Sequence, residues 1–347
     1  MSDPIVKFDN VSIVFGSNPK IALPLIDEGK NRSQIQNETG QILGVADCSL
    51  DIAEGEVLVL MGLSGSGKST LLRAVNGLNP VVRGNVQVRC PGIEGWRDPH
   101  HCNAKELREL RLDWVSMVFQ QFGLLPWRTV AENVGFGLEL AGRDKADIAG
   151  KVDEQLKLVG LSDWAEKRVH ELSGGMQQRV GLARAFATEA PILLMAEPYS
   201  ALAPLIRARL QDELIDLQQR LKRTIIFVSH DLDEAIKIGS RIAIMEGGRI
   251  IQIGTAQEIL THPANDYVAD FVAHMNPLAV LRAREAMRQT GSRGRGHGKA
   301  PSVAPEASLS DIMQLQLESG MPVYVEEAGR VMGIVEAADI HRALLNR

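Results

Sequence analysis

Residues 62–70, GLSGSGKST, decide the fold of this chain. They fit the pattern G-x-x-x-x-G-K-[ST] with every fixed position occupied. The run 56–61 before them predicts a buried strand, and the run 71–75 after them predicts the start of a helix. The glycines therefore lie where a strand turns into a helix N-terminus. Backbone N–H groups and the helix dipole at such a place bind phosphate.

The motif predicts a nucleoside triphosphate site. We expect Lys68 to reach the β- and γ-phosphates and the Ser69 hydroxyl to ligate Mg²⁺. The other loop residues expected at the phosphates are Gly62, Ser64, Gly65, Ser66, Gly67 and Thr70. Phe15, near the end of an alternating segment, is either a stacking surface for adenine or an ordinary core residue at a strand end.

Composition limits the class of protein. The chain has 347 residues and 45% apolar content, enough for one large α/β domain and a smaller unit. A net charge of −5 argues against a nucleic-acid partner. Three cysteines without a C-x-x-C pair suit a reducing cytosol. No apolar run approaches the roughly 18 residues that cross a bilayer, so we expect a soluble chain that reaches any membrane through a partner.

The remaining pattern predicts an α/β fold around the phosphate loop. Strands alternate with helices after residue 80, which indicates a mostly parallel sheet; the strands are expected at 84–88, 114–119, 192–195 and 224–228, with a hairpin over 241–251. Strands at 5–15 and 47–52 predict a flanking antiparallel sheet, interrupted by an insert over 16–40 with a short helix near 33–38. Residues 129–170 predict a small helical subdomain.

A second phosphate-binding motif lies at 172–179, LSGGMQQR. Ser173 is placed to cap a helix that continues to Ala187, and the N-terminus of that helix offers another anion site. Polar residues also follow two predicted buried strands: Glu197 comes after the first and His230 after the second. Read alone, Glu197 is a surface charge and His230 a satisfied histidine; after both phosphate motifs, they become candidates for catalysis.

The order of 62–70, Gln120, 172–177, Glu197 and His230 resembles that of the ATP-binding subunits of ABC transporters, over residues 1–275. Finer features resemble importers of quaternary amines (glycine betaine, proline betaine, choline), most closely the choline-uptake ATPase. They are the insert, the stretch FGLLPWRTVAENVGFGLELAG at 122–142 and HMNPL at 274–278. The tail, residues 306–347, resembles half of a CBS module. It is joined through residues 276–305, in which 277–289 predict a basic helix and 291–305 a flexible basic linker.

The resemblance implies roles for single residues. Gln120 would touch the metal and line a groove for the membrane partner. Glu197 would polarise the attacking water, and His230 would contact the γ-phosphate. The helix start at 172–177 would close over the nucleotide bound by a second copy, through Ser173, Gly174, Gly175 and Gln177. ATP and Mg²⁺ are the implied cofactors.

It also implies partners and a location. Two copies would form a homodimer that sandwiches ATP, and the dimer would act on two transmembrane permease subunits. A substrate-binding protein would act through the permease. The chain would lie on the cytoplasmic face of the inner membrane, and it would have no nucleic-acid partner.

Two positions depart from the family pattern. The family has an aspartate where Ala196 stands and another where Ala203 stands; the first supports Mg²⁺ and the second joins the two copies. The two alanines indicate an engineered or divergent copy, or slow hydrolysis. The alternative to an importer ATPase is therefore a weakly hydrolysing, ATP-binding regulator. A soluble ABC ATPase of repair or translation fits less well, because that class has two cassettes in one chain or a long coiled-coil insert.

Overall fold

The computed structural model describes residues 3–90, 92, 95–119, 123–200, 202–273, 275–289 and 300–345. They form two compact units. The first runs to His230 and includes Ile238–Ile253; the second comprises Asp231–Lys237 and the chain from Gly254 onward. Gln120 and the glycine-rich linker residues 291–299 lie outside the described residues.

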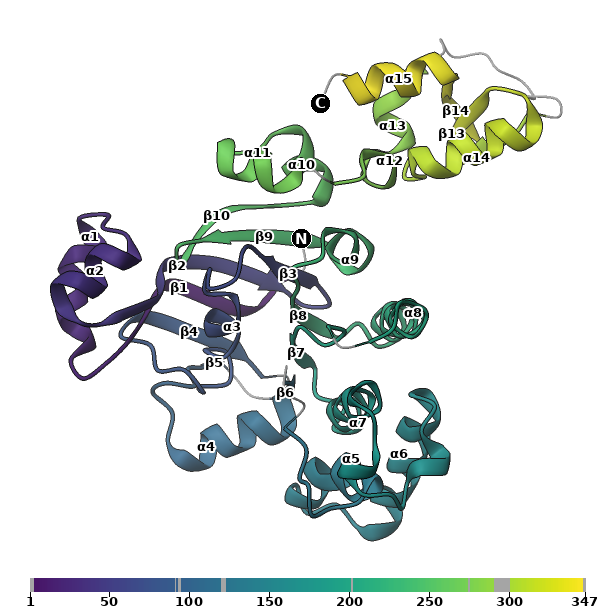
Figure 1. Cartoon of the computed structure of the whole chain (residues 1–347). Coiled ribbons are helices and arrows are strands. Elements are labelled where there is room, and N and C mark those ends of the chain that lie inside the picture. Colours follow the sequence, from purple (N-terminus) through teal and green to yellow (C-terminus); the bar gives the residue numbers. More distant parts are fainter. Residues whose placement is uncertain are drawn as a thin grey trace. The chain divides into compact units, whose positions relative to one another are not determined.

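The first unit is built on a six-stranded sheet in the order β10-β9-β3-β8-β7-β6 (Figure 1). Its strands are β3 (Val57–Met61), β6 (Val115–Val118), β7 (Ile192–Ala196), β8 (Thr224–Val228), β9 (Arg241–Glu246) and β10 (Arg249–Gly254). The pairs β3–β8, β3–β9, β6–β7 and β7–β8 are parallel. β3, β7 and β8 are buried along their whole length, because both faces of the sheet are covered. The predicted parallel core is confirmed.

An antiparallel sheet with the order β2-β1-β4-β5 flanks this core, as predicted. Its strands are β1 (Pro4–Phe15), β2 (Ile42–Ala53), β4 (Arg83–Arg89) and β5 (Trp96–Arg97). Apolar side chains of both sheets and of helix α3 (Lys68–Leu72) form one core cluster. Leu71 and Leu72 are fully buried in it, which fixes the helix that follows the phosphate loop.

Residues 16–40 form an insert between β1 and β2. It contains η1 (Pro19–Ala22), α1 (Leu23–Asp27) and α2 (Arg32–Thr39). A separate apolar cluster packs it onto the two strands; its buried members are Val14, Ala22, Ile26, Ile35, Leu43 and Ala46. Two arginines add to this packing: Arg83 pairs with Asp27 at 2.6 Å, and Arg249 Nη2 donates to Ile26 O at 3.0 Å.

Helices α5 and α6 form the helical subdomain predicted over 129–170, and α7 packs against both of them beside the β6 edge of the sheet (Figure 1). The helical elements between β5 and β8 are α4 (Ala104–Glu109), η2 (Leu110–Trp114), α5 (Val130–Leu140), α6 (Lys145–Leu158), η3 (Ser162–Trp164), η4 (Val169–Glu171), α7 (Gly174–Ala187) and α8 (Pro204–Leu221). The Ser116 hydroxyl donates to Ala185 O at 3.0 Å and ties α7 to the sheet.

The second unit carries a four-stranded sheet in the order β11-β14-β13-β12. Its elements are α9 (Leu232–Ile238, the last residue of which belongs to the first unit), α10 (Ala256–Thr261), α11 (Asp266–Val272), α12 (Pro277–Val280), α13 (Ala283–Ala286), β11 (Arg288–Gln289), β12 (Ser302–Val303), α14 (Leu309–Ser319), β13 (Val323–Glu327), β14 (Arg330–Val335) and α15 (Ala337–Leu345).

The prediction of one continuous basic helix over 277–289 is wrong. Leu281 and Met287 are extended, because the chain turns there so that Val280, Leu281, Ala283 and Ala286 are all buried. Within the range predicted as a linker, Ser302 and Val303 form β12, which pairs in parallel with β13.

Candidate functional site: a phosphate-loop cavity

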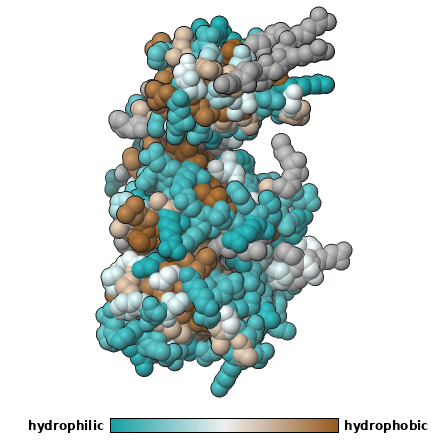
Figure 2. Space-filling view, turned by 90° about the vertical axis from the view of Figure 1, so that its right-hand side faces the viewer, coloured by the Kyte–Doolittle hydropathy of each residue, from teal (hydrophilic) through white to brown (hydrophobic). Residues whose placement is uncertain are grey.

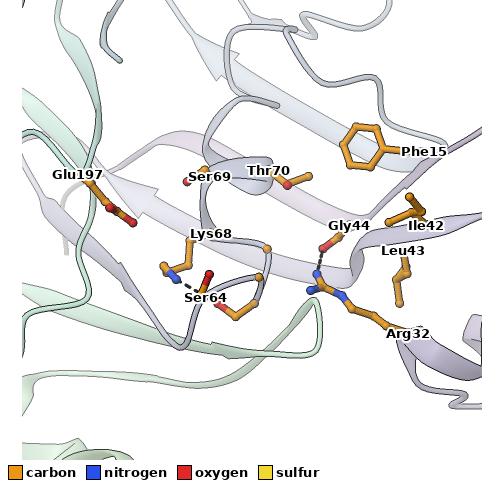
Figure 3. A pocket seen from close by; sticks show the side chains of 13 residues that line it. Phe15, Arg32, Ile42, Leu43, Gly44, Ser64, Lys68, Ser69, Thr70 and Glu197 are labelled. Carbon is orange, nitrogen blue, oxygen red and sulfur yellow. Dashed lines mark hydrogen bonds between the residues drawn. The ribbon is translucent and has the colours of Figure 1, made fainter. Parts of the chain in front are cut away.

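The loop between β3 and α3 borders a cavity of ≈ 370 Å³ (Figure 3). The cavity is lined by Phe15, Arg32, Ile42, Leu43, Gly44, Ser64, Gly65, Ser66, Gly67, Lys68, Ser69, Thr70 and Glu197. Its volume lies within the range of small-molecule sites, roughly 300–1,000 Å³. Of the residues predicted from the phosphate motif, all but Gly62 line it.

Gly62 and Gly67 are required by backbone geometry. Gly62 has φ +139°, and a Cβ atom built on it would lie 2.1 Å from the carbonyl oxygen of Met245. Gly67 has φ +106°, and its Cβ would lie 2.7 Å from the carbonyl oxygen of Gly44. No side chain fits at either place, so the loop depends on glycine to pack closely against the neighbouring backbone.

Lys68 is 6% exposed and donates to the loop itself. Its Nζ lies 2.7 Å from Gly62 O and 2.9 Å from Leu63 O. Burial lowers the pKa of Lys68, while the negative charge of Glu197 acts in the opposite direction. The ammonium group is thus held by weak neutral acceptors that phosphate oxygens can replace with stronger, charge-assisted bonds.

The end of the cavity away from Lys68 and Glu197 carries the apolar side chains of Phe15, Ile42 and Leu43, with Arg32 beside them (Figure 3). A Cβ on Gly44 would lie 2.8 Å from Phe15 Cε2 and 3.0 Å from Thr70 Cγ2, so only glycine lets this end close onto the loop. Phe15 both packs against the core cluster and faces the cavity, so its two sequence interpretations are compatible.

Sequence reasoning missed Arg32 and Gly44. Arg32 comes from α2 of the insert, and its Nη2 donates to Gly44 O. The only signal in the sequence was a cationic residue at the start of the predicted short helix. Nothing in the spacing shows that the insert folds back to the phosphate loop.

Glu197 and His230 meet at the carboxyl ends of neighbouring parallel strands, β7 and β8. The distance from His230 Nδ1 to Glu197 Oε2 is 3.8 Å, and the side chains are 66% and 20% exposed, respectively. Ligands of open α/β sheets bind at these strand ends. Glu197 has φ +50°, a backbone conformation that non-glycine residues seldom adopt and that often marks a functional position.

Comparison with known proteins identifies the family to which this chain belongs. The ABC transporter family matches residues 45–200, and the CBS domain family matches residues 298–346. The glycine betaine/proline betaine transport ATP-binding protein ProV of Escherichia coli K12 is 44% identical over 98% of this chain and 82% of its own length. The chain belongs to the ABC transporter ATP-binding subunits.

Other relatives agree with this assignment. The glycine betaine transport protein OpuAA of Bacillus subtilis 168 is 42% identical over 97% of this chain and 78% of its own length. The trimethylamine N-oxide transport protein TmoW of Pelagibacter ubique is 39% identical over 100% of this chain and 99% of its own. A solved dimer of the cassette MJ0796 bound to ADP and Pi superposes with a TM-score of 0.61, at 29% identity, over 72% of this chain and 98% of that one. The predicted ABC fold is confirmed.

The ABC signature lies outside the cavity lining. The Ser173 hydroxyl caps α7 by accepting from Met176 N at 3.4 Å, as predicted. Gln177 Nε2 donates to Val169 O and Leu172 O, which fixes the turn before the helix. Ser173 and Gly174 are exposed, and Gly175 is half-buried. The start of α7 is therefore accessible at Ser173 and Gly174, whereas the side-chain amide of Gln177 is engaged by the preceding turn.

The two alanines differ in their surroundings. Ala196 ends β7, is 1% exposed and belongs to the core cluster. Ala203 is the exposed N-cap of α8, and its side chain offers no acceptor to the first turn. The described residues contain no group of three His, Cys, Asp or Glu side chains that could hold a metal ion.

Proposed function

We propose that this protein is the subunit that energises import of a quaternary amine, such as glycine betaine, proline betaine or choline, across the cytoplasmic membrane. The phosphate-loop cavity carries the proposal, because a buried lysine, a glycine-rich loop that leads into a helix and a group of apolar side chains match a nucleoside triphosphate. The substrate class rests on relatives whose names specify glycine betaine, proline betaine and trimethylamine N-oxide.

The binding role is tested with Lys68→Ala. Removing the buried ammonium takes away the main positive charge on the β- and γ-phosphates, so ATP binding should be lost in an equilibrium assay. Lys20→Ala, which removes an exposed cation from the insert, is the matched control and should bind as the parent does. Unchanged ATP affinity in Lys68→Ala would contradict the assignment of the cavity.

Mg²⁺ fits the donor set in part. The Ser69 hydroxyl would hold it together with Gln120, and both Ser69 and the Glu197 carboxylate line the same cavity. Mg²⁺ in such sites is held mostly by phosphate oxygens and water, so few protein ligands suffice. When bound, the ion neutralises charge on the phosphates.

The chain's own groups perform the remaining steps. Lys68 and the loop N–H groups hold the phosphates in place. Glu197 accepts a hydrogen bond from the attacking water and orients it. His230, whose Nδ1 lies 3.8 Å from Glu197 Oε2, would contact the γ-phosphate and report its presence. Phosphoryl transfer needs this positioning and charge neutralisation more than covalent participation.

We further propose that two copies sandwich two ATP molecules, with Ser173 and Gly175 of one copy completing the site of the other. The solved relative is a dimer with ADP and Pi. In sedimentation, the Glu197→Gln variant should form dimers when ATP is present and remain monomeric when it is absent. Absence of ATP-dependent association in both parent and variant would refute the sandwich.

Two permease subunits and a substrate-binding protein are the proposed partners, at the cytoplasmic face of the inner membrane. None of the helices in the described ranges is long and apolar enough to cross a bilayer. Trp127, 68% exposed beside the helical subdomain, offers an apolar contact for a permease. Figure 2 shows a mostly hydrophilic face on which apolar areas are separate. A neighbouring gene for a binding protein with an aromatic cage would support the substrate class.

The domain limits 1–275, 276–305 and 306–347 remain part of this proposal. A weakly hydrolysing, ATP-binding regulator is the second candidate, and Ala196 and Ala203 are the observations that favour it. Turnover of ATP by the purified parent separates the two: an importer ATPase turns over repeatedly, whereas a regulator closes on ATP and stays closed.

A further inference from the structure

Arg32 is a cation in the cavity that belongs to none of the nucleotide-binding motifs. Beyond its bond to Gly44 O, its guanidinium lies against the phosphate loop. A Cβ built on Gly67 would lie 3.3 Å from Arg32 Nη2, and one on Gly65 would lie 3.8 Å from Nη1. The glycine backbone therefore gives the guanidinium direct access to the loop.

The insert holds Arg32 in a defined position. Asn31 caps α2 through a capping box with Gln34, which fixes the first turn of the helix. Ile35, one turn after Arg32 on the same face, is fully buried in the cluster between the insert and the strands. The ion pair between Arg83 and Asp27 secures the preceding helix. An arginine held in this way loses little side-chain freedom when it binds a ligand.

Most of the hydrogen-bonding capacity of Arg32 is unused in the described structure. A guanidinium has five N–H donors, and Arg32 Nε is buried with no acceptor among the described residues. Arg32 is half-buried, and this burial lowers the pKa of its guanidinium. Among the described residues lining the cavity, Arg32 and Lys68 are cationic and Glu197 alone is acidic. A partly buried cation with unused donors is stabilised by an anion.

The position of Arg32 in the cavity indicates which part of a bound nucleotide it would contact. In Figure 3 it lies on the side of Phe15 and Gly44, away from Lys68 and Glu197. Thr70, in the first turn of α3, is the residue of the phosphate motif drawn closest to Phe15 in this view. We propose that Arg32 is a nucleotide-binding residue that donates to the α-phosphate of bound ATP or ADP from the insert. This inference rests on the proposed ATP-binding function and adds a contact that the common motifs do not supply.

The test measures ADP and ATP affinity of the full chain by calorimetry, for Arg32→Ala, Arg32→Gln and Arg32→Lys. The Ala and Gln variants lose a hydrogen bond to a charged group, so we expect their affinity for both nucleotides to fall about tenfold. The loss should be equal for ADP and ATP, because both have the α-phosphate. Arg32→Lys should retain part of the affinity, since lysine keeps the positive charge but lacks the paired N–H donors of the planar guanidinium.

The salt dependence of nucleotide affinity distinguishes a direct phosphate contact of Arg32 from a purely structural role. Removing a contact with phosphate makes the affinity less dependent on salt, whereas a distorted loop weakens binding without changing that dependence. Lys20→Ala, with the same change of charge in the same insert, should leave affinity and salt dependence unchanged. A loss below twofold, a loss confined to ATP, or an unaltered salt dependence would each overturn the proposal. Lys68→Ala run in parallel reports on the cavity itself, so failure of the Arg32 contact is distinguishable from failure of the ATP site.

Discussion

Restoring the two carboxylates that the family pattern contains should speed ATP hydrolysis. In the variant Ala196→Asp with Ala203→Asp, the first carboxylate supports Mg²⁺ at the end of β7. Loss of a group that hydrogen-bonds to the ligands of a metal typically lowers metal affinity or reaction rate about 10–100-fold. Such a change in rate corresponds to about 1.4–2.7 kcal/mol in the activation barrier. We therefore expect at least a tenfold higher ATPase rate at limiting Mg²⁺, and a smaller gain when Mg²⁺ is saturating.

The structure predicts opposite effects of the two substitutions on stability. Ala196 is 1% exposed, so an aspartate there buries a carboxyl group, at a cost of about 1–3 kcal/mol in the nucleotide-free protein. Ala203 is the N-cap of α8 without a side-chain acceptor, so an aspartate there should stabilise the helix by about 1 kcal/mol. That gain corresponds to a rise in Tm of roughly 2–4 °C for a unit of this size.

Two control variants separate chemistry from stability. Ala203→Ser supplies the cap without a carboxylate, so it should raise the Tm and leave the ATPase rate unchanged. Ala196→Asn has nearly the shape of aspartate without its charge, so it should lower the Tm without accelerating turnover. The assay is phosphate release over a Mg²⁺ titration, with the Tm measured in parallel. If the double aspartate variant keeps both the parental rate and the parental Mg²⁺ dependence, this explanation of the two alanines is wrong.

Two further predictions concern ionisable groups of the first unit. Burial acts to raise the pKa of Asp47, but hydrogen bonds from Arg249 and Arg83 outweigh it and lower the pKa, so this carboxylate stabilises the fold above pH about 4 and loses that effect as the pH falls further. The stability gap between the parent and Asp47→Asn in urea unfolding should accordingly be largest near pH 6 and shrink toward pH 3; a gap that is constant over this range would contradict the ion-pair assignment. Burial raises the pKa of the Cys48 thiol to about 12, whereas Cys102 is only half-buried, so a thiol reagent at pH 8 should modify Cys102 first and Cys48 only on unfolding. Peptide mapping after brief labelling checks this order, and early modification of Cys48 would contradict the packing of β2.

The sequence by itself determined the elements whose signals are local. The strand–loop–helix around Lys68 follows from glycines that tolerate unusual backbone angles, and the start of α7 follows from the capping hydroxyl of Ser173. The buried strands follow from uninterrupted apolar runs, which suit a sheet covered on both faces. The motif order was sufficient to indicate the family.

Tertiary structure decided the features that depend on distant parts of the chain. Arg32 reaches the phosphate loop only because Ile35 and the Asp27–Arg83 ion pair hold the insert against two strands. The break in 277–289 arises because apolar side chains on both sides of Leu281 are buried together, which one straight helix cannot achieve. Periodicity describes one element at a time, whereas these positions are set by the free energy of packing several elements together.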